Sequence, residues 1–233
     1  MSRRYIAFDI ETAKVLPADV SDLLAHRPLG IACAAAAMSD SSETLTWFGA
    51  GAVPAPQLSR AEARDLVGDL SARAREGYTL LSWNGLSFDF NVLAEESALP
   101  EECARLALNH VDMMFHAVCT VGHFIGLQKA AEGLRIPGKA GGLTGSEAPA
   151  RWAEGCHEEV LGYNVQDARL SLAIAQACES RRELVWVTRK GTIGRMPLPN
   201  GWLTVREARR LPLPDTSWMS QPPTRESFTS WMP

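Results

Sequence analysis

The chain has 233 residues, of which 46% are hydrophobic and 21% charged, and it carries a formal net charge of −4. That length is enough for one domain with a substantial core, or for one domain with appendages. The composition is ordinary for a soluble globular protein and excludes a strongly basic chain, so it gives no global sign of nucleic-acid binding, although a local basic patch remains compatible with it.

Cysteine usage and hydropathy indicate the cellular setting. The five cysteines are scattered and show no CxxC spacing; they are Cys33, Cys103, Cys119, Cys156 and Cys178. An odd, scattered set argues against a disulfide framework or a structural zinc site and favours buried free thiols in a reducing compartment. No apolar run approaches the roughly 18 residues of a membrane span, and no apolar signal segment follows the opening MSRR. We therefore expect a cytoplasmic protein that does not enter a membrane.

The first elements of the chain read as a meander of strands. Residues 4–10 (RYIAFDI) are apolar and rich in strand formers, and they end at the polar ETAK. We expect Phe8 and Ile10 of this strand to face a core. In residues 29–38 (LGIACAAAAM) the alanines favour a helix. The Pro-Leu-Gly before this segment and the SDSSE turn after it favour a strand, paired with the following TLTWFG.

Strands and helices then alternate. Residues 58–77 predict a helix, since Ser59 is suited to the N-cap, Glu62 follows three residues later and Gly77 provides a stop. We expect next a strand (YTLLSWNG), two helices (SFDFNVLAEESAL and PEECARLAL), a short strand (HVDMM) and helices within 115–134 and 147–180. A meander followed by strand–helix alternation predicts an α/β domain with a mixed β-sheet, an antiparallel meander plus parallel strands, flanked by helices.

The amino-acid composition changes near residue 183. The last part of the chain is rich in tryptophan and proline. Because disordered tails are usually poor in tryptophan, we expect 183–233 to pack against the main domain, 1–182, as a C-terminal extension and not as a second domain.

Carboxylates stand at three places along the chain. Asp9 and Glu11 share one face of the first strand, because residues i and i+2 of a strand point to the same side. Read alone, they are solvated charges at a strand end. Asp89 stands at the start of a predicted helix, where a capping role is an equally good reading. Tyr163 and Asp167, at i and i+4, share a helical face, a pairing that is also common in purely structural helices.

Taken together, the three segments resemble a known family. FDIET, then N-x-x-x-F-D about eighty residues on, then Y-x-x-x-D after a similar gap, is similar to the DEDD superfamily of 3′→5′ exonucleases, which have a ribonuclease H-like fold. The resemblance covers about residues 4–175. Gly162 occupies the position of the histidine of the histidine-type enzymes, and Tyr163 matches the tyrosine-type (DEDDy) subgroup, which includes the proofreading domains of family-B DNA polymerases.

The resemblance implies a metal centre. Four carboxylates in one cleft repel, since one like-charge pair at ~4 Å is worth about 4 kcal/mol at an effective dielectric near 20. Two divalent cations resolve this, and oxygen-only ligands suit Mg²⁺ or Mn²⁺. In such enzymes one metal generates the attacking hydroxide and the other stabilises the leaving 3′ oxygen. The implied ligands are Asp9, Glu11, Asp89 and Asp167. Tyr163 would orient the attacking water, since a tyrosine is a poor base at neutral pH.

Other residues are candidates for contact with the substrate. Thr12 follows the acidic pair, although a turn-forming hydroxyl is an equal reading; Asn84 and Phe88 flank Asp89, and Phe88 also fits a plain core position. Lys139, in the loop GKAGGLTG, is placed to meet a phosphate. A basic stretch between 181 and 195 could follow the backbone of a single strand, with a solvated face as its default reading.

The sequence thus predicts a two-metal-ion 3′→5′ exonuclease that releases nucleoside 5′-monophosphates from the 3′ end of single-stranded DNA. Two alternatives remain open: an exoribonuclease that acts on RNA 3′ ends, and a non-catalytic nucleic-acid-binding or scaffolding module. The expected partner is nucleic acid, and a polymerase or repair partner is not identified by any residue pattern.

Overall fold

The structure is a computed structural model that describes residues 3–17, 19–20, 22–138 and 142–233. Its main sheet has five strands in the order β3-β2-β1-β4-β5. They are β1 (Tyr5–Thr12), β2 (Ile31–Met38), β3 (Thr44–Phe48), β4 (Thr79–Ser82) and β5 (Val111–Asp112). The first three form an antiparallel meander, whereas β4 and β5 run parallel to β1. The predicted mixed sheet is confirmed.

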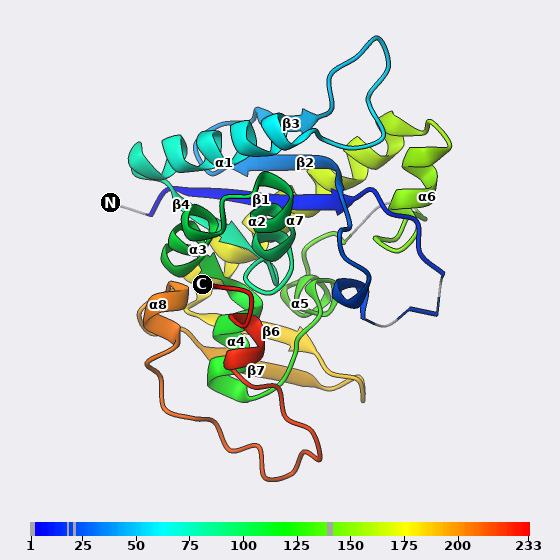
Figure 1. Ribbon diagram of the computed structural model, residues 1–233. Coiled ribbons are helices and arrows are strands. Elements are labelled where there is room, and N and C mark those ends of the chain that lie inside the picture. Colours follow the sequence, from blue (N-terminus) through cyan, green and yellow to red (C-terminus); the bar gives the residue numbers. More distant parts are fainter. Residues whose placement is uncertain (1–2, 18, 21, 139–141) are drawn as a thin grey trace.

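Helices cover both faces of this sheet (Figure 1). They are α1 (Arg60–Arg75), α2 (Asp89–Ser97), α3 (Pro100–Asn109), α4 (Met113–Val121), α5 (Leu127–Leu134), α6 (Ala148–Ala153) and α7 (His157–Arg181). α1, α2 and α3 share one hydrophobic core with the sheet, and α5 and α7 share a second core on the opposite face. The central strand is therefore buried on both sides.

The alternation of β1 decides where its carboxylates point. Ile6, Phe8 and Ile10 enter the core under α1 and α2, as predicted for Phe8 and Ile10, while Tyr5 and Ala7 enter the core on the α7 side. Because residues of a strand alternate between faces, the residues at positions 9 and 11 face α7. The strand runs to Thr12, two residues past the predicted end, with a bulge between Glu11 and Thr12.

The alanine-rich segment forms β2 and not a helix. Residues 31–37 are all buried, and β2 lies between β1 and β3 with α7 packed across it. Small side chains allow the helix to approach the sheet closely, so burial on both faces outweighs the helix propensity of alanine. Asp9 pairs with Ala35 in this register, which leaves room beside its carboxylate.

The predicted start of α1 is also confirmed. The Ser59 hydroxyl accepts a hydrogen bond from the amide of Glu62, and the Glu62 carboxylate accepts one from the amide of Ser59, which forms a complete capping box. The chain leaves the helix at Gly77, whose φ of 90° lies in the left-handed region that glycine adopts without strain.

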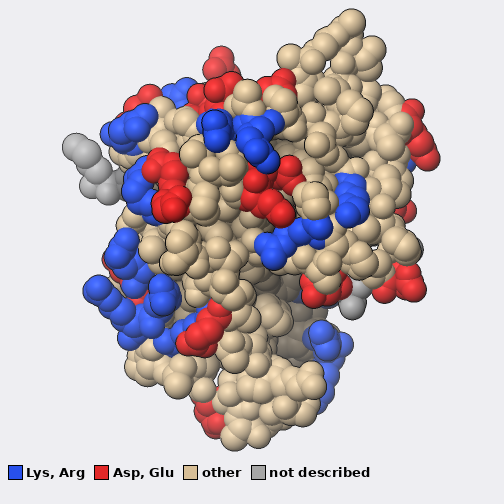
Figure 2. Space-filling view, viewed as in Figure 1, with Lys and Arg blue, Asp and Glu red and all other residues tan. Residues whose placement is uncertain are grey.

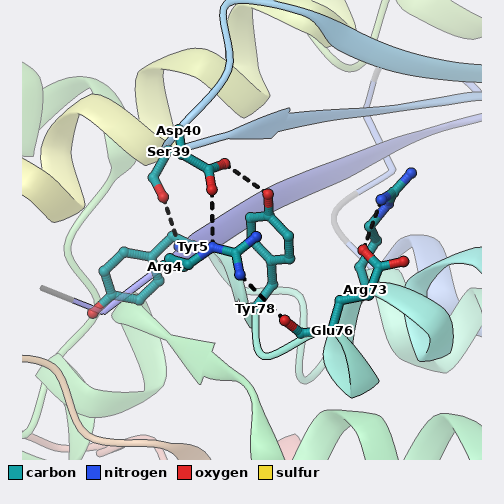
Figure 3. A network of polar contacts seen from close by, with 7 residues as sticks. All are labelled: Arg4, Tyr5, Ser39, Asp40, Arg73, Glu76 and Tyr78. Carbon is teal, nitrogen blue, oxygen red and sulfur yellow. Dashed lines mark hydrogen bonds and ion pairs between the residues drawn. The ribbon is translucent and has the colours of Figure 1, made fainter. Parts of the chain in front are cut away.

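A polar network holds the end of β1 that lies away from its carboxylates (Figure 3). The guanidinium of Arg4 lies 3.9 Å from the centre of the Tyr78 ring and donates to Asp40, which also accepts from the Tyr78 hydroxyl. The amide of Tyr5 donates to Ser39 Oγ, and the amide of Ser39 donates to the carbonyl of Tyr5. These contacts tie β1 to the β2–β3 turn and to the α1–β4 turn, and so fix the register of the strands.

The C-terminal part adds a second sheet and returns to the main domain. It contains β6 (Glu183–Val187), β7 (Ile193–Pro197), α8 (Val205–Ala208) and the short 3₁₀ helix η2 (Glu226–Phe228). Strands β6 and β7 form an antiparallel hairpin that packs on α5. Trp202 is fully buried, and its Nε1 donates to the carbonyl of Ala175 in α7. Among the described residues, no helix is both long and apolar enough to span a bilayer.

Candidate metal centre and active site

Three carboxylates converge where β1 ends beneath α7. Asp9, Glu11 and Asp167 each offer an oxygen, and these oxygens all lie within 4.8 Å of one another. β1 supplies the first two from one face, and α7, packed across β1, supplies Asp167. Glu11 and Asp167 are buried, at 6% and 7% exposure. The structure thus brings together three of the four acids that the sequence predicts as metal ligands.

Asp89 adjoins this cluster from the start of α2. β4 pairs with β1 only from Tyr5 to Ala7, and further along β1 the amide of Ile10 donates to Asp89 Oδ1 at 3.0 Å. Asp89 is the first residue of α2, and its side chain binds β1, whereas Phe88 holds the N-cap position. Burial, followed by the charges of Asp112 and Asp167, raises the pKa of Asp89 to about 7.

Tyr163 lies one helical turn before Asp167, as the i, i+4 spacing predicts. Its side chain is 9% exposed, and its hydroxyl forms a hydrogen bond with the Asp167 carboxylate. Burial first, and then the charges of Asp167 and Glu11, raise the pKa of Tyr163 well above its ordinary value. The phenol therefore remains protonated at neutral pH and serves as a hydrogen-bond donor.

Asn164 is a member of the site that the sequence reading missed. It is fully buried, and its Nδ2 donates a 2.7 Å hydrogen bond to Asp9 Oδ2. Its Oδ1 lies 4.0 Å from Cys33 Sγ. The available signal was its spacing, since a residue three before Asp167 lies on the same helical face as that ligand.

Asp112 holds the loop that leads to Asp89. It is the N-cap of α4 and accepts from the amide of Phe115 at 2.9 Å. Its two oxygens also accept from the amides of Asn84, at 3.1 Å, and Leu86, at 2.8 Å. Burial raises the pKa of Asp112 to about 6, although these hydrogen bonds act to lower it. One side chain therefore connects the end of β5 to the loop after β4.

The predicted substrate contacts occupy different environments. Thr12 is buried at the end of β1, after the bulge. Asn84 has a φ of 73°, in the left-handed region, and its Oδ1 accepts from the Ser87 hydroxyl. Phe88 is partly buried and packs against the hydrophobic core, in agreement with the alternative reading of this residue. Lys139 lies outside the described residues.

The chemistry of the donor set fits a hard divalent cation. The three converging groups are carboxylates. The nearest thiol, on Cys33, stays protonated because burial, together with the charges of Glu11 and Asp9, raises its pKa. Oxygen ligands without a thiolate suit Mg²⁺ or Mn²⁺ rather than structural zinc.

Comparison with known proteins assigns the family. The model of the RNase H superfamily matches residues 40–178. The chain belongs to the RNase H superfamily. The matched region contains Asp89 and Asp167 and begins after β1, so Asp9 and Glu11 are placed by the structure alone. A search of curated proteins finds no match.

A solved structure shares the RNase H-like fold. The family B DNA polymerase from the hyperthermophilic archaeon Pyrobaculum calidifontis is similar over 77% of this chain, with a TM-score of 0.55 and 18% sequence identity. The chain spans 25% of that polymerase. This likeness and the family match confirm the RNase H-like α/β fold, and the superfamily together with the acidic cluster indicates a nuclease.

Proposed function

We propose that the protein is a metal-dependent 3′→5′ exonuclease of the tyrosine-type DEDD subgroup, which releases nucleoside 5′-monophosphates from single-stranded DNA. The observation that carries the proposal is the convergence of carboxylate oxygens of Asp9, Glu11 and Asp167 within 4.8 Å of one another. The Tyr163 hydroxyl is hydrogen-bonded to the Asp167 carboxylate. Gly162, in place of a histidine, supports the tyrosine-type assignment.

The carboxylates are the proposed ligands of two divalent cations, Mg²⁺ or Mn²⁺. When bound, such ions lower the pKa of water and stabilise the negative charge that develops on the phosphate and the leaving oxygen. In the chain itself, Asn164 orients the Asp9 carboxylate through its hydrogen bond. Asp89 is fixed against β1 by the amide of Ile10 and completes the acidic set from the α2 side.

Tyr163 is proposed to position the nucleophile and not to remove its proton. Its raised pKa keeps the phenol protonated, so its hydroxyl can donate a hydrogen bond but is a poor base. Thr12, the last residue of β1, and Asn84, in the loop after β4, are the proposed contacts of the 3′-terminal nucleotide. Burial of Glu11, Asp89 and Asp167 limits the access of water to the acids and strengthens their attraction for cations.

We further propose that residues 1–182 form the catalytic domain and that 183–233 are an extension packed on it. The contacts of β6 with α5 and of Trp202 with α7 support this division. The extension carries seven Lys and Arg residues against four Asp and Glu residues, in a chain with an overall net charge of −4. This local basic excess is compatible with a role in holding nucleic acid.

A panel of substrates tests the proposal. Single-stranded DNA, duplex DNA and RNA, each labelled at the 5′ or the 3′ end, are incubated with the protein and Mg²⁺ or Mn²⁺. We expect immediate release of mononucleotide from 3′-labelled single-stranded DNA and a ladder of shortening products from the 5′-labelled strand. Faster turnover of RNA would favour the exoribonuclease, internal cleavage would contradict an exonuclease, and binding without turnover would indicate a non-catalytic module.

A further inference from the structure

A wide groove lies outside the acidic cluster, between α2, the C-terminal segment and the segment that precedes β2. Its volume is about 800 Å³, and its lining includes Arg27, Asn91, Ala94, Ala98, Pro100 and Trp231. Asn91, Ala94 and Ala98 lie on one face of α2 and at its C-cap. Volumes of 300–1,000 Å³ are typical of ligand sites.

The lining suits a flat, partly apolar ring that is linked to an anion. Ala94 and Ala98 are small lining residues that leave space for a ring, and Trp231 adds an aromatic side chain to the lining. At the rim, Arg27 donates a 2.7 Å hydrogen bond to Asn91 and lies 3.9 Å from Glu95. Such an ion pair between half-exposed side chains is weak, so a phosphate can compete for the guanidinium. Figure 2 shows acidic and basic side chains interspersed on this face of the molecule.

Trp231 is held in place by the extension. Its Nε1 donates to the carbonyl of Leu86 at 2.7 Å, and Phe228, three residues earlier, is buried against Phe115. Arg225 fixes the start of this segment, since its guanidinium donates to the carbonyls of Arg209, Leu211, Pro212 and Cys119. The indole is therefore preorganised: its donor is satisfied, and Trp231 packs against the hydrophobic core while remaining partly exposed.

The groove adjoins the candidate active site through two segments. Leu86, which Trp231 contacts, lies in the loop that Asp112 holds and that leads into Asp89. On the other side, Lys14 follows Thr12, its amide donates to the carbonyl of Leu29, and its Nζ donates to the carbonyl of His26, next to Arg27. Two exposed cations, Lys14 and Arg27, thus lie on the path from the end of β1 to the groove.

We propose that this groove, the Trp231 groove, binds the single strand upstream of its 3′-terminal nucleotide, with a base stacked on Trp231 and a phosphate bound by Arg27. The proposal deepens the function proposed above and rests on it. Base–aromatic stacking tolerates any base, because every base has a π-face. The groove would therefore add affinity for strands of several nucleotides without adding sequence preference.

Strand affinity measured in EDTA, where no metal-dependent cleavage occurs, tests this groove separately from the proposed catalysis. A 5′-fluorescein oligodeoxythymidylate of about twelve nucleotides is titrated in EDTA, and fluorescence anisotropy reports Kd for each variant. We expect Trp231→Ala to weaken binding about tenfold and Trp231→Phe to retain most of the affinity, since stacking needs only the ring. Trp218→Ala is the matched control, because Trp218 is exposed on the same extension but lies outside the groove lining.

Arg27 provides an independent readout. Arg27→Ala should lower the slope of log Kd against log salt by about 0.7, the value for one phosphate contact on a single strand. Wild-type affinity in both Trp231→Ala and Arg27→Ala would overturn the groove while leaving mononucleotide release untouched. An equal loss in Trp231→Phe and Trp231→Ala would assign the effect to the Leu86 contact and also overturn it. Absence of strand binding by the wild-type protein in EDTA would overturn the groove, whereas the catalytic proposal is tested separately by metal-dependent release of mononucleotide.

Discussion

Asn164 in α7 holds Asp9 in β1 through a 2.7 Å hydrogen bond from Nδ2 to Oδ2. The two residues are 155 positions apart in the sequence, and the bond crosses the contact between the helix and the central strand of the sheet. A carboxylate held by a buried amide keeps one orientation, which is what a metal ligand requires. The interaction therefore gives Asn164 a positioning role next to the proposed metal centre.

Asn164→Ala should raise the Mn²⁺ concentration needed for half-maximal nuclease activity by about 10- to 100-fold, the usual cost of losing a partner of a metal ligand. Activity at saturating Mn²⁺ should recover in part. Activity is measured over a Mn²⁺ titration with a 3′-labelled strand. An unchanged metal requirement would show that the amide only fills space.

Tyr163→Phe should lower the rate of mononucleotide release about tenfold, which corresponds to about 1.4 kcal/mol of activation free energy. The loss should be smaller than that in Asp167→Asn, because the hydroxyl orients a water and is not a ligand. Since the pKa of Tyr163 is raised, the pH profiles of variant and wild type should have the same shape between about pH 6 and 9. Disappearance of one limb of the profile in the variant would assign the proton transfer to Tyr163.

Asp89 should make the ion-free protein less stable as the pH rises. Its pKa, about 7 in the folded protein against an ordinary 3.8, means that the folded state binds a proton more tightly than the unfolded chain. The unfolding free energy therefore falls from about pH 4 to about pH 7 and is level above that range. Asn keeps an acceptor for the amide of Ile10 and does not ionise.

We therefore expect Asp89→Asn to match the wild type near pH 4 in EDTA and to exceed its stability at about pH 8 by a few kcal/mol, at about 1.4 kcal/mol per pKa unit. Urea unfolding at several pH values provides the comparison. A stability difference between the variant and the wild type that does not grow with pH would contradict a raised pKa of the buried Asp89 carboxyl in the metal-free protein.

Gly133 tests how closely the extension packs on the domain. A Cβ at this position in α5 would overlap the backbone of Val185 and Trp186 in β6, whereas a Cβ at Gly68 in α1 would meet open space. Gly133→Ala should destabilise the protein by about 1–3 kcal/mol through overpacking. The matched change Gly68→Ala should stabilise it by up to about 1 kcal/mol through helix propensity. Thermal unfolding of both variants measures these changes in stability. Equal gains in stability would mean that β6 does not pack closely on α5.

Patterns among residues close together in the sequence predicted much of the fold. The capping box at Ser59 and Glu62, and the alternation of Phe8 and Ile10 about Asp9, depend on near neighbours in the sequence, and both are present in the structure. The poly-alanine strand needed its flanking turns to be recognised, because its burial between two layers is a tertiary property.

The spacing of the acidic residues in the sequence predicted the site, whereas the residues that hold them in place by hydrogen bonds were not predicted. The spacing of Asn164 places it on the helical face of Asp167, but its bond to Asp9 and the triple role of Asp112 depend on contacts between elements far apart in sequence. The Trp231 groove has the same origin, since it joins α2 to a residue more than 130 positions later. Long-range polar contacts of this kind become visible only once the sheet register is known.

The most direct test of the proposed metal centre is the rate of mononucleotide release from a 3′-labelled single strand by Asp9→Asn and Asp167→Asn, with Mg²⁺ and with Mn²⁺. Asp65→Asn is the matched control, since this aspartate is exposed on α1. The proposed site predicts a loss of at least about 100-fold in both site variants, with folded protein by circular dichroism and a control that keeps wild-type activity. Full activity of both site variants with either metal would contradict it.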